Sequence, residues 1–242
     1  MRKIIFTDLE QSIPGLEAPQ PASEVIPDWY KRMATYFGKD YGLKTDKQVY
    51  LSERGITHAP QTMKRCMPLF DAMTAGYIIK TICDVQVTQE NGAPFYIWSA
   101  NYEVITFHGA KQVEGNPVAH PKIDPPKWTS PWTIQTPPGY SSMMVPPMNH
   151  HNGIFEIFSG VVDTDTYNDR VHFPFRLLDW GFEGVIPAGT PMAQVIPFKR
   201  DSFQMELGGD NSRQRANRTN SKIRQHFYNA YRNHFWARKS FR

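Results

Sequence analysis

The residues best suited to chemistry lie together in the stretch SGVVDTDTYND at positions 159–169. Its carboxylates, Asp163, Asp165 and Asp169, follow an apolar Gly-Val-Val and accompany Tyr167. A carboxylate beside a bound water can act as a general base, and oxygens at alternate positions could be presented to Mg²⁺ or Ca²⁺. Short polar side chains in such a stretch also bond to nearby backbone N–H groups and join two strands. We expect a structural turn, and keep a cation site or small-ligand site at Asp163, Asp165 and Asp169 as the alternative.

The other metal-binding residue types form weaker patterns. His150 and His151 are adjacent, and neighbouring residues of a strand face opposite sides, so the two imidazoles cannot easily share one ion. Cys66 and Cys83 are the only cysteines, which is too few for a multi-cysteine metal site or for a secreted fold held by disulfides. We expect both thiols to be reduced and no cofactor to be needed by a structural protein.

The composition favours a β protein. A chain of 242 residues with 40% hydrophobic and 13% aromatic residues can bury a substantial core, and its 20 prolines are spread among short apolar runs. No run approaches the roughly 18–20 apolar residues of a spanning helix. The start MRKIIFTDLEQ becomes acidic too early for a secretory signal. We therefore expect no membrane association and no secretion.

Charge is divided unevenly along the chain. Residues 211–242 hold 9 Lys or Arg and no Asp or Glu, which leaves 27 − 9 = 18 basic against 23 acidic residues in 1–210, a net charge of −5. An acidic body thus carries a basic tail, and the two are electrostatically complementary.

Strand and turn signals define three segments. Residues 1–64 read as an extended N-terminal arm with short elements, 65–205 as a β body with an insertion at about 92–132, and 206–242 as a linker followed by a basic helix. Tyr77 to Val87 reads as one extended face that leads into a hairpin at Asn91-Gly92. Residues 109–138 read as a long surface excursion held by Trp128 and Trp132.

The expected C-terminal helix is amphipathic. Ile223, Phe227, Tyr231 and Phe235 recur every four residues with Trp236 beside them, and Arg224 and Arg232 lie on the other face. The aromatic side would be a large apolar patch if it stayed in water, so we expect it to fold back on the body or dock on a neighbouring subunit. A separate protein partner and, less favoured, nucleic acid remain alternatives.

Three pieces of the chain resemble the deoxyuridine triphosphatase (dUTPase) family and its β-clip relatives. DAMTAGYIIKT resembles the opening strand of that family, SGVVDTDTYND its Gly-Val-Ile-Asp turn, and FEGVIPAGTPMAQVIPF its closing strand pair. The resemblance covers about 65–200 and implies a mainly β, jelly-roll-type body that is commonly trimeric. The whole chain also resembles a group of proteins from cyanobacterial tailed phages and some bacteria, a resemblance that implies no activity.

The same resemblance implies roles that the sequence supports only in part. It places the sugar-orienting and water-orienting carboxylate at Asp163 and the sugar-stacking ring at Tyr167, which is displaced by one residue because Thr166 is inserted. The phosphate-clamping arginine is absent from 147–153, Ile78 replaces an aspartate of the opening strand, and no Gly-rich closing tail is visible. A binding site that lacks preorganised cations binds a triphosphate poorly.

These observations give two expectations of function. The first is a non-catalytic structural or binding protein of phage type, a homo-oligomer (trimer favoured) or a partner of other phage proteins, in the host cytoplasm or the virion. The alternative is a nucleotide pyrophosphohydrolase-like enzyme, or a binder of phosphorylated small molecules, with Asp163, Asp165 and Tyr167 at its site and Mg²⁺ as cofactor.

Overall fold

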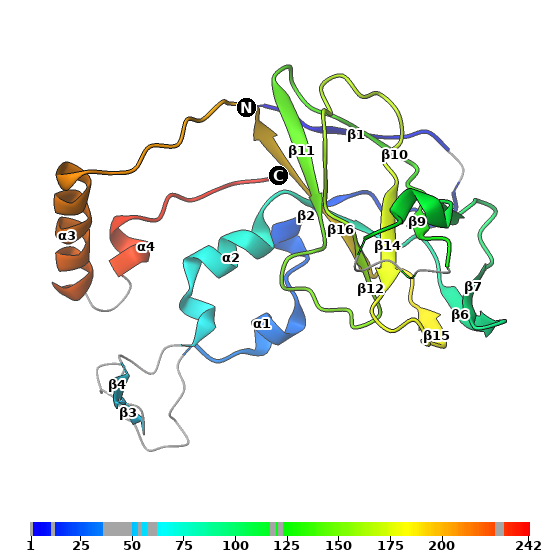
Figure 1. Cartoon of the computed structure of the whole chain (residues 1–242), viewed down its shortest axis with the longest axis horizontal. Coiled ribbons are helices and arrows are strands. Elements are labelled where there is room, and N and C mark those ends of the chain that lie inside the picture. Colours follow the sequence, from blue (N-terminus) through cyan, green and yellow to red (C-terminus); the bar gives the residue numbers. More distant parts are fainter. Residues whose placement is uncertain are drawn as a thin grey trace. The chain divides into compact units, whose positions relative to one another are not determined.

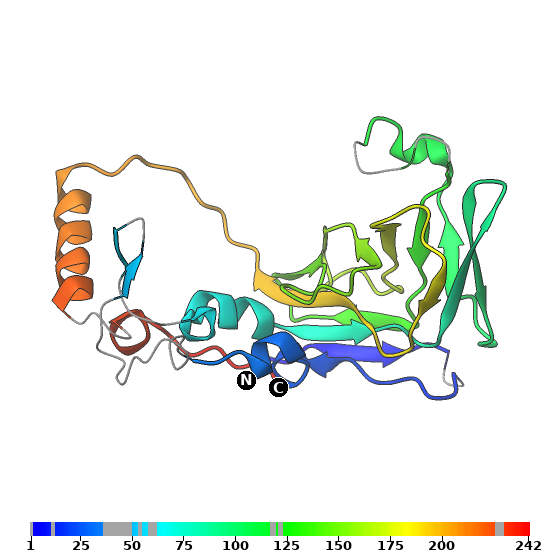
Figure 2. The same ribbon diagram turned by 90° about the horizontal axis from the view of Figure 1, so that it is seen from below.

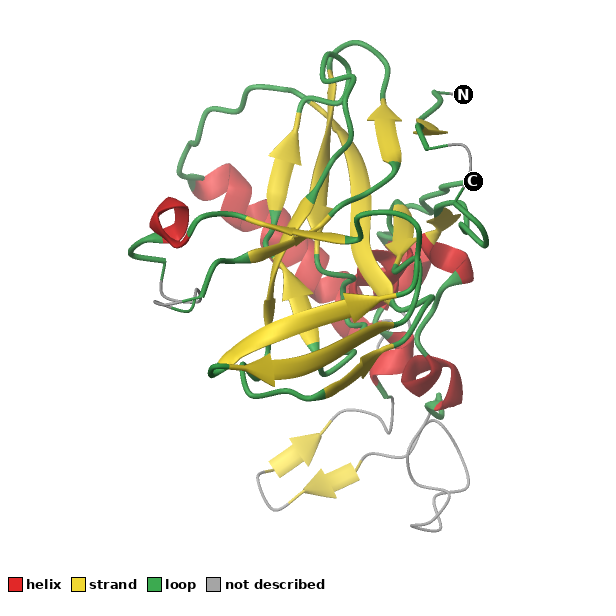
Figure 3. Cartoon of the chain, turned by 90° about the vertical axis from the view of Figure 1, so that its right-hand side faces the viewer, coloured by secondary structure: helices red, strands yellow, loops and turns green. Residues whose placement is uncertain are grey.

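The computed structural model is mainly β, with several antiparallel sheets and few helices (Figure 3). It describes residues 2–10, 13–35, 50–52, 55–57, 62–116, 120, 123–225 and 230–242. The chain divides into two compact units, which are considered separately. The first comprises Met1–Val25, Ala75–Arg200 and Phe241–Arg242, and the second comprises Ile26–Thr74 and Asp201–Ser240.

A five-stranded antiparallel sheet, in the order β13-β11-β16-β5-β2, is the largest sheet of the first unit. Its strands are β2 (Gln20–Pro21), β5 (Tyr77–Lys80), β11 (Tyr140–Val145), β13 (Gly160–Val162) and β16 (Pro191–Lys199). The long β16 lies between β11 and β5 (Figures 1 and 2), with Met144 opposite Val195 and Ile79 opposite Ala193. These four side chains are buried, so β16 contributes to the core on the first half of its length.

Gly76 allows β5 to approach β16. Its φ is +69°, and a Cβ at this position would lie 2.0 Å from the carbonyl oxygen of Val195. Its own carbonyl accepts a hydrogen bond from the N–H of Ala22 at 2.9 Å, next to β2. Only glycine fits here, because any side chain would collide with backbone and would also need a disfavoured conformation.

Gln194 is a fully buried polar side chain in β16. Its Oε1 accepts a hydrogen bond from the N–H of Met148 at 2.8 Å, and its Nε2 donates to the carbonyl of Ala75 at 2.6 Å. One side chain thus satisfies main-chain groups of two segments that flank the sheet, which offsets the cost of burying an amide.

A four-stranded sheet, in the order β12-β14-β9-β8, carries the aromatic core. Its strands are β8 (Ile105–Phe107), β9 (Pro126–Trp128), β12 (Phe155–Ile157) and β14 (Phe173–Leu177). The rings of Trp128 and Phe175 stack with centroids 4.8 Å apart, and Phe155 contacts both. All three are buried, and buried aromatic rings contribute a large share of the apolar area removed from water.

The expected hairpin is confirmed in a three-stranded sheet, β15-β6-β7. Its strands are β6 (Val85–Glu90), β7 (Ala93–Trp98) and β15 (Gly184–Ile186). The turn residues Asn91 and Gly92 have φ of 53° and 78°, the left-handed conformation that Asn-Gly turns favour. The extended segment expected from Tyr77 to Val87 is divided, because β5 ends at Lys80 and β6 belongs to a different sheet.

The surface excursion expected at 109–138 is correct only in its first part. Trp128 and Trp132 are buried, as expected. However, β9 and β10 (Trp132–Gln135) are strands of the body, and β10 pairs with β1 (Ile5–Asp8). The many Pro and Lys residues hid the short strand β9, which follows the helical turn η3 (Ala110–Val113).

The second unit holds most of the helical elements. They are α1 (Asp28–Arg32), η2 (Met63–Arg65), α2 (Met67–Thr74), α3 (Asp210–Gln225) and α4 (Ala230–His234), whereas η1 (Ala22–Glu24) lies in the first unit. A small hairpin pairs β3 (Tyr50–Ser52) with β4 (Gly55–Thr57). The hydroxyl of Tyr30 donates to the carbonyl of Lys64 at 2.9 Å, which joins α1 to η2.

The expected segment boundaries differ from those of the structure. The start of the expected N-terminal arm pairs through β1 and β2 with the sheets of the first unit, so residues 1–25 belong to the body. The linker that was expected ahead of the helix is shorter than predicted, because α3 begins at Asp210. An aspartate in the first turn favours a helix, and Arg213 pairs with it at 3.1 Å.

Candidate functional site

The acidic stretch forms a tight turn directly after β13. The carbonyl of Asp163 accepts hydrogen bonds from the N–H groups of Thr166 at 3.0 Å and Tyr167 at 2.9 Å. The hydroxyl of Thr166 donates to the same carbonyl at 3.2 Å. This is the arrangement by which short polar residues close a turn, and it matches the structural interpretation of the sequence.

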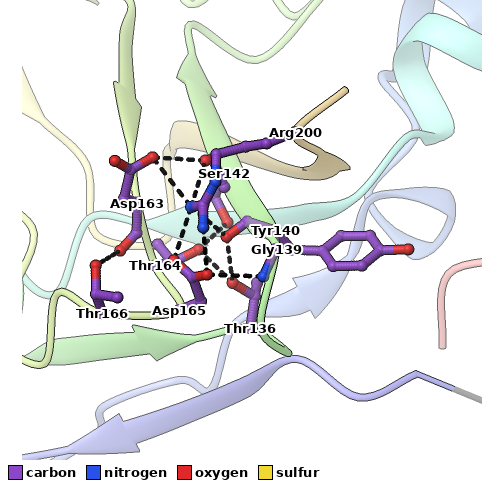
Figure 4. A network of polar contacts seen from close by, with 10 residues as sticks. Thr136, Gly139, Tyr140, Ser142, Asp163, Thr164, Asp165, Thr166 and Arg200 are labelled. Carbon is purple, nitrogen blue, oxygen red and sulfur yellow. Dashed lines mark hydrogen bonds and ion pairs between the residues drawn. The ribbon is translucent and has the colours of Figure 1, made fainter. Parts of the chain in front are cut away.

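Thr164 fixes the turn to the ends of two strands. Its side chain is fully buried, and its hydroxyl bonds to the hydroxyls of Thr136 at 2.7 Å and Ser142 at 2.9 Å (Figure 4). The N–H of Thr136 also donates to the carbonyl of Thr164 at 3.1 Å. The position of both neighbouring carboxylates is therefore set by a buried hydroxyl network.

Asp165 points inward and meets an arginine. Its Oδ1 accepts from Nη1 of Arg200 at 2.7 Å, its Oδ2 accepts from Nη2 of the same guanidinium, and Oδ2 also accepts from the N–H of Gly139 at 2.8 Å. Only 6% of its side chain is exposed. The hydrogen bonds from Arg200, followed by that from Gly139, lower the pKa of Asp165 from 3.8 to about 2.

Asp163 lies on the outer side of the same arginine. Its Oδ1 accepts from the hydroxyl of Ser141 at 2.7 Å and from Nη1 of Arg200 at 3.2 Å. Figure 4 shows the guanidinium between the two carboxylates. In contrast to Asp165, 62% of the Asp163 side chain is exposed.

Sequence reasoning missed Arg200, because we sought a cation near 147–153. The residue follows β16, whose Lys199 pairs with Tyr140 of β11, and its N–H donates to the carbonyl of Gly139 at 2.9 Å. This strand register carries the guanidinium to the acidic turn. Two carboxylates at alternate positions of one turn, Asp163 and Asp165, were the signal in the sequence that could have indicated a nearby cation.

Tyr167 and Asp169 point to local partners. The Tyr167 hydroxyl donates to the carbonyl of Arg170 at 3.3 Å, and Asp169 Oδ1 accepts from the N–H of Arg170 at 2.7 Å. Within the described residues no group of three His, Cys, Asp or Glu side chains could hold a metal ion. The turn directs the carboxylates of Asp163, Asp165 and Asp169 to different hydrogen-bond partners, and the metal site expected at these three residues stays a prediction.

A cavity of about 610 Å³ adjoins the exposed side of the turn. It is lined by His108, Lys127, Val161, Val162, Asp163, Thr166, Tyr167, Arg170, Val171, His172 and Pro174. Arg170 forms an ion pair with Glu10. His172 Nδ1 accepts a hydrogen bond from the N–H of Ser130 at 3.4 Å. Burial, followed by the nearby charges of Lys127 and Arg170, lowers the pKa of His172.

The C-terminal interaction residues are only partly accounted for. Trp236 donates through Nε1 to both carboxylate oxygens of Asp71 in α2, at 3.1 and 3.0 Å, and Lys239 pairs with the same carboxylate at 2.5 Å. Tyr231 and Phe235 remain partly exposed. Among the aromatic residues expected to make contacts, Trp236 therefore does so within the second unit, through Asp71.

The other residues expected to form the C-terminal interaction surface are Arg232, Phe227 and Arg224. Arg232 lies near Arg65, where its charge adds to burial in lowering the pKa of the Arg65 guanidinium. Phe227 lies outside the described residues, and the same is true of the side chain of Arg224. No helix in the described part of the chain is long and apolar enough to cross a membrane.

Comparisons with known proteins add little to this geometry. No protein-family profile matches the chain. No curated protein matches it either. Among the solved structures, a point mutant of the Staphylococcus bacteriophage 80alpha dUTPase with dUpNHpp aligns with 67% of this chain and 88% of that chain. The identity is 11% and the TM-score 0.29, a level of similarity that carries no argument about fold or activity.

Proposed function

We propose that the protein is a non-catalytic structural or binding component that associates with copies of itself. One observation carries the first half of this proposal: the carboxylates of the acidic turn are engaged in structural bonds to Arg200, Gly139 and Ser141. A general base must be able to take a proton from a water in reach. Asp165 is nearly inaccessible and its lowered pKa makes it a weak base.

The cation at the turn is engaged as well. Arg200 donates to both carboxylates and to the carbonyl of Tyr140 at 3.2 Å, so its guanidinium is not preorganised for a phosphate. Catalysis of phosphate release depends on cations that are held ready for developing negative charge. The turn therefore supports a structural role better than hydrolysis.

An assay of nucleotide turnover tests this half of the proposal. We expect no release of phosphate or pyrophosphate from a panel of nucleoside triphosphates with Mg²⁺, either by the natural chain or by Asp163→Asn. Turnover by the natural chain that disappears in Asp163→Asn, while Asp210→Asn retains it, would show that the turn is catalytic. Asp210 is a suitable control because it is exposed and lies in α3.

The cavity beside the turn favours a second candidate, a binder of phosphorylated small molecules. Its volume falls in the range of ligand pockets, about 300–1,000 Å³. It combines the exposed Asp163 and the ring of Tyr167 with the cationic Lys127, which forms no ion pair with a described residue. An aromatic wall and an unneutralised cation suit a ligand with a planar and an anionic part.

Thermal shift measurements separate the two candidates. A ligand at 100 times its dissociation constant stabilises a fold by about 2.7 kcal/mol. For the second candidate we expect such a shift with a nucleotide or with inorganic phosphate, its loss in Lys127→Gln and its retention in Lys111→Gln, which changes an exposed lysine of η3. No shift with any compound of the panel removes the candidate.

The finer features of fold and setting form part of the same proposal. The three sequence pieces that resemble dUTPases lie on the end of α2 and β5, on β13 with its turn, and on β15 with β16, and β5 pairs with β16. This neighbourhood supports a β-clip, jelly-roll-type body. We assign the protein to a phage-type setting in the virion or host cytoplasm, with a trimer as the favoured assembly.

A further inference from the structure

The segment between β16 and α3 exposes an unusual amount of apolar surface. Phe203, Met205 and Leu207 are 92%, 87% and 86% exposed, whereas the next large hydrophobic side chain in the described part of the chain, Val161, is 60% exposed. We call residues 202–207 the arm. Contiguous apolar surface of this kind marks an interaction site in a folded protein.

The arm has the pattern of a β-strand without a partner. Its apolar residues alternate with Ser202, Gln204 and Glu206, so an extended chain places them on one side and the polar residues on the other. It forms no backbone hydrogen bond with any described residue. Figure 1 draws it as the extended segment ahead of α3.

A matching apolar face lies on the three-stranded sheet. In the pairing register Val185 of β15 lies opposite Gln86 of β6, which lies opposite Ile97 of β7, and Phe95 lies opposite Thr88. These residues share the outer face of the sheet, and Phe95, Ile97 and Val185 are each more than two-fifths exposed. We call these three side chains the receiving face.

The two surfaces agree in spacing. Phe95 and Ile97 are two residues apart on one strand, as are Phe203 and Met205 on the arm. Alternate residues of extended chains repeat at about 6.5 Å, so the two rows of side chains can interdigitate. Neither Gln86 nor Thr88 places a charge on the face, and the polar side of the arm would remain in water.

The charges around the two surfaces are opposite. Residues 81–110 and 177–190, which contain the receiving face, include five acidic residues and no Lys or Arg. These acids, all of them exposed, are Asp84, Glu90, Glu103, Asp179 and Glu183. The helix that follows the arm, α3, carries the exposed Arg213, Arg215, Arg218 and Lys222 against a single acid, Asp210. An apolar row followed by a cationic helix therefore fits an apolar face bordered by carboxylates.

We propose that the arm of one copy of this chain docks on the receiving face of a second copy, with α3 of the first copy near the acidic border of the second. The inference deepens the self-association in the proposed function and rests on it. Exchange of arms makes each copy both donor and acceptor, so every copy takes part in two such contacts in a closed ring such as the favoured trimer. Two contacts for each copy bring the surface area buried by a short arm closer to the roughly 1,200–2,000 Å² that a stable interface buries.

Two sets of substitutions test the two surfaces independently. The arm variant is Phe203→Ser with Met205→Ser and Leu207→Ser, and the face variant is Phe95→Thr with Ile97→Thr and Val185→Thr. All six positions are exposed, so both variants should fold, which an unchanged Tm would verify. We expect each variant to weaken association at least tenfold in sedimentation velocity over a range of concentrations.

Two control variants lie outside the proposed contact. Gln204→Ser with Glu206→Ser changes only the polar side of the arm, and Val161→Thr changes an exposed apolar residue on β13 in another sheet. Both should associate like the natural chain. If Val161→Thr abolished association while the face variant still associated, the proposal would be overturned, because the contact would then involve β13.

Mixing the two impaired variants identifies the occupant of the face. The face variant retains a natural arm, and the arm variant retains a natural receiving face, so together they can form one natural contact. We expect the mixture to form a complex of one copy of each, which neither variant forms alone. Failure of the mixture to associate would overturn the exchange, because it would show that the two surfaces do not meet between copies.

Charge reversal provides a separate readout. Glu90→Lys with Glu183→Lys should weaken association, as should Arg215→Glu with Arg218→Glu, and a mixture of the two variants should associate more strongly than either alone. Natural association should also weaken with added salt. Equal association by all of these variants would show that α3 does not approach the acidic border.

The outcomes separate this inference from the proposed function. If the natural chain is monomeric at every concentration, the proposed self-association is wrong, and this inference is lost with it. If the natural chain associates and the arm variant associates equally well, self-association stands and only the arm contact is wrong.

Discussion

Arg200 and Asp165 form a two-point ion pair in which both guanidinium Nη atoms donate to the two oxygens of one carboxylate. The partners are 35 residues apart in the chain and meet because β13 and β16 both pair antiparallel with β11. This ion pair fixes the acidic turn at 163–167, the stretch of the sequence best suited to chemistry, to the end of β16. Planar two-point geometry is a property of arginine that lysine does not reproduce.

Replacing Arg200 should loosen the acidic turn. Arg200→Gln removes both guanidinium hydrogen bonds of the Asp165 carboxylate, so we expect the Tm to fall by a few degrees. Arg200→Lys should lower the Tm by less, to a value between those of the natural chain and Arg200→Gln. Arg213→Gln is the matched control, since it removes a solvent-exposed ion pair and should leave the Tm unchanged. Equal effects of Arg200→Gln and Arg213→Gln in differential scanning calorimetry would contradict the structural role of the pair.

The same ion pair predicts how stability depends on acid. The folded-state pKa of Asp165 is about 2, below its ordinary 3.8. Its contribution to the free energy of unfolding is therefore fully present above about pH 4. It is lost as the pH falls from about 4 to 2, because the unfolded chain then binds the proton more readily. Urea unfolding at several pH values should show a steeper loss for the natural chain than for Asp165→Asn. Parallel curves would show that the carboxyl is not shifted.

Gly76 should tolerate no side chain. In Gly76→Ala the new Cβ would meet the backbone of Val195 in a conformation that also strains alanine, and we expect a loss of about 2–4 kcal/mol in urea unfolding. Gly92→Ala provides the control, since Gly92 has a similar φ of +78° with open space around it. That variant should lose only about 1 kcal/mol. A similar loss in both would mean that strain alone, without the collision, sets the requirement at Gly76.

Asp71 should hold the C-terminal residues within the second unit. Asp71→Ala removes the acceptor of Trp236 and the ion-pair partner of Lys239, so we expect faster proteolysis after Lys239 and a red shift of tryptophan fluorescence. Asp210→Ala, which removes an exposed helical ion pair, should change neither property. Unchanged cleavage in Asp71→Ala would show that other contacts hold the tail.

Local signals were sufficient where the structure is local. The Asn91-Gly92 turn and the closure of the acidic turn on its own backbone each follow from a few neighbouring residues. Turn chemistry of this kind acts within four residues of the chain, so it can be inferred without a fold.

The sequence could not predict the features that depend on strand register. Arg200 reaches Asp165 through the pairing of β11 with both β13 and β16, and no spacing in the chain encodes that distance. The strand β9 was hidden in a Pro-rich segment, because a three-residue strand has no measurable alternation. The start of α3 was mistaken for a linker, since a helix with an almost wholly polar surface lacks the periodicity that sequence reading uses.

The amide of Gln194 has a chemical consequence of its own. It accepts at one end and donates at the other, both to main chain, in a place closed to solvent. Glutamate would supply no donor and would bring a charge, methionine would supply neither bond, and asparagine is one methylene too short to span the gap. In a library with every amino acid at this position, we therefore expect only glutamine to give folded protein. Residue 194 is thus a sensitive reporter of correct assembly of the sheet.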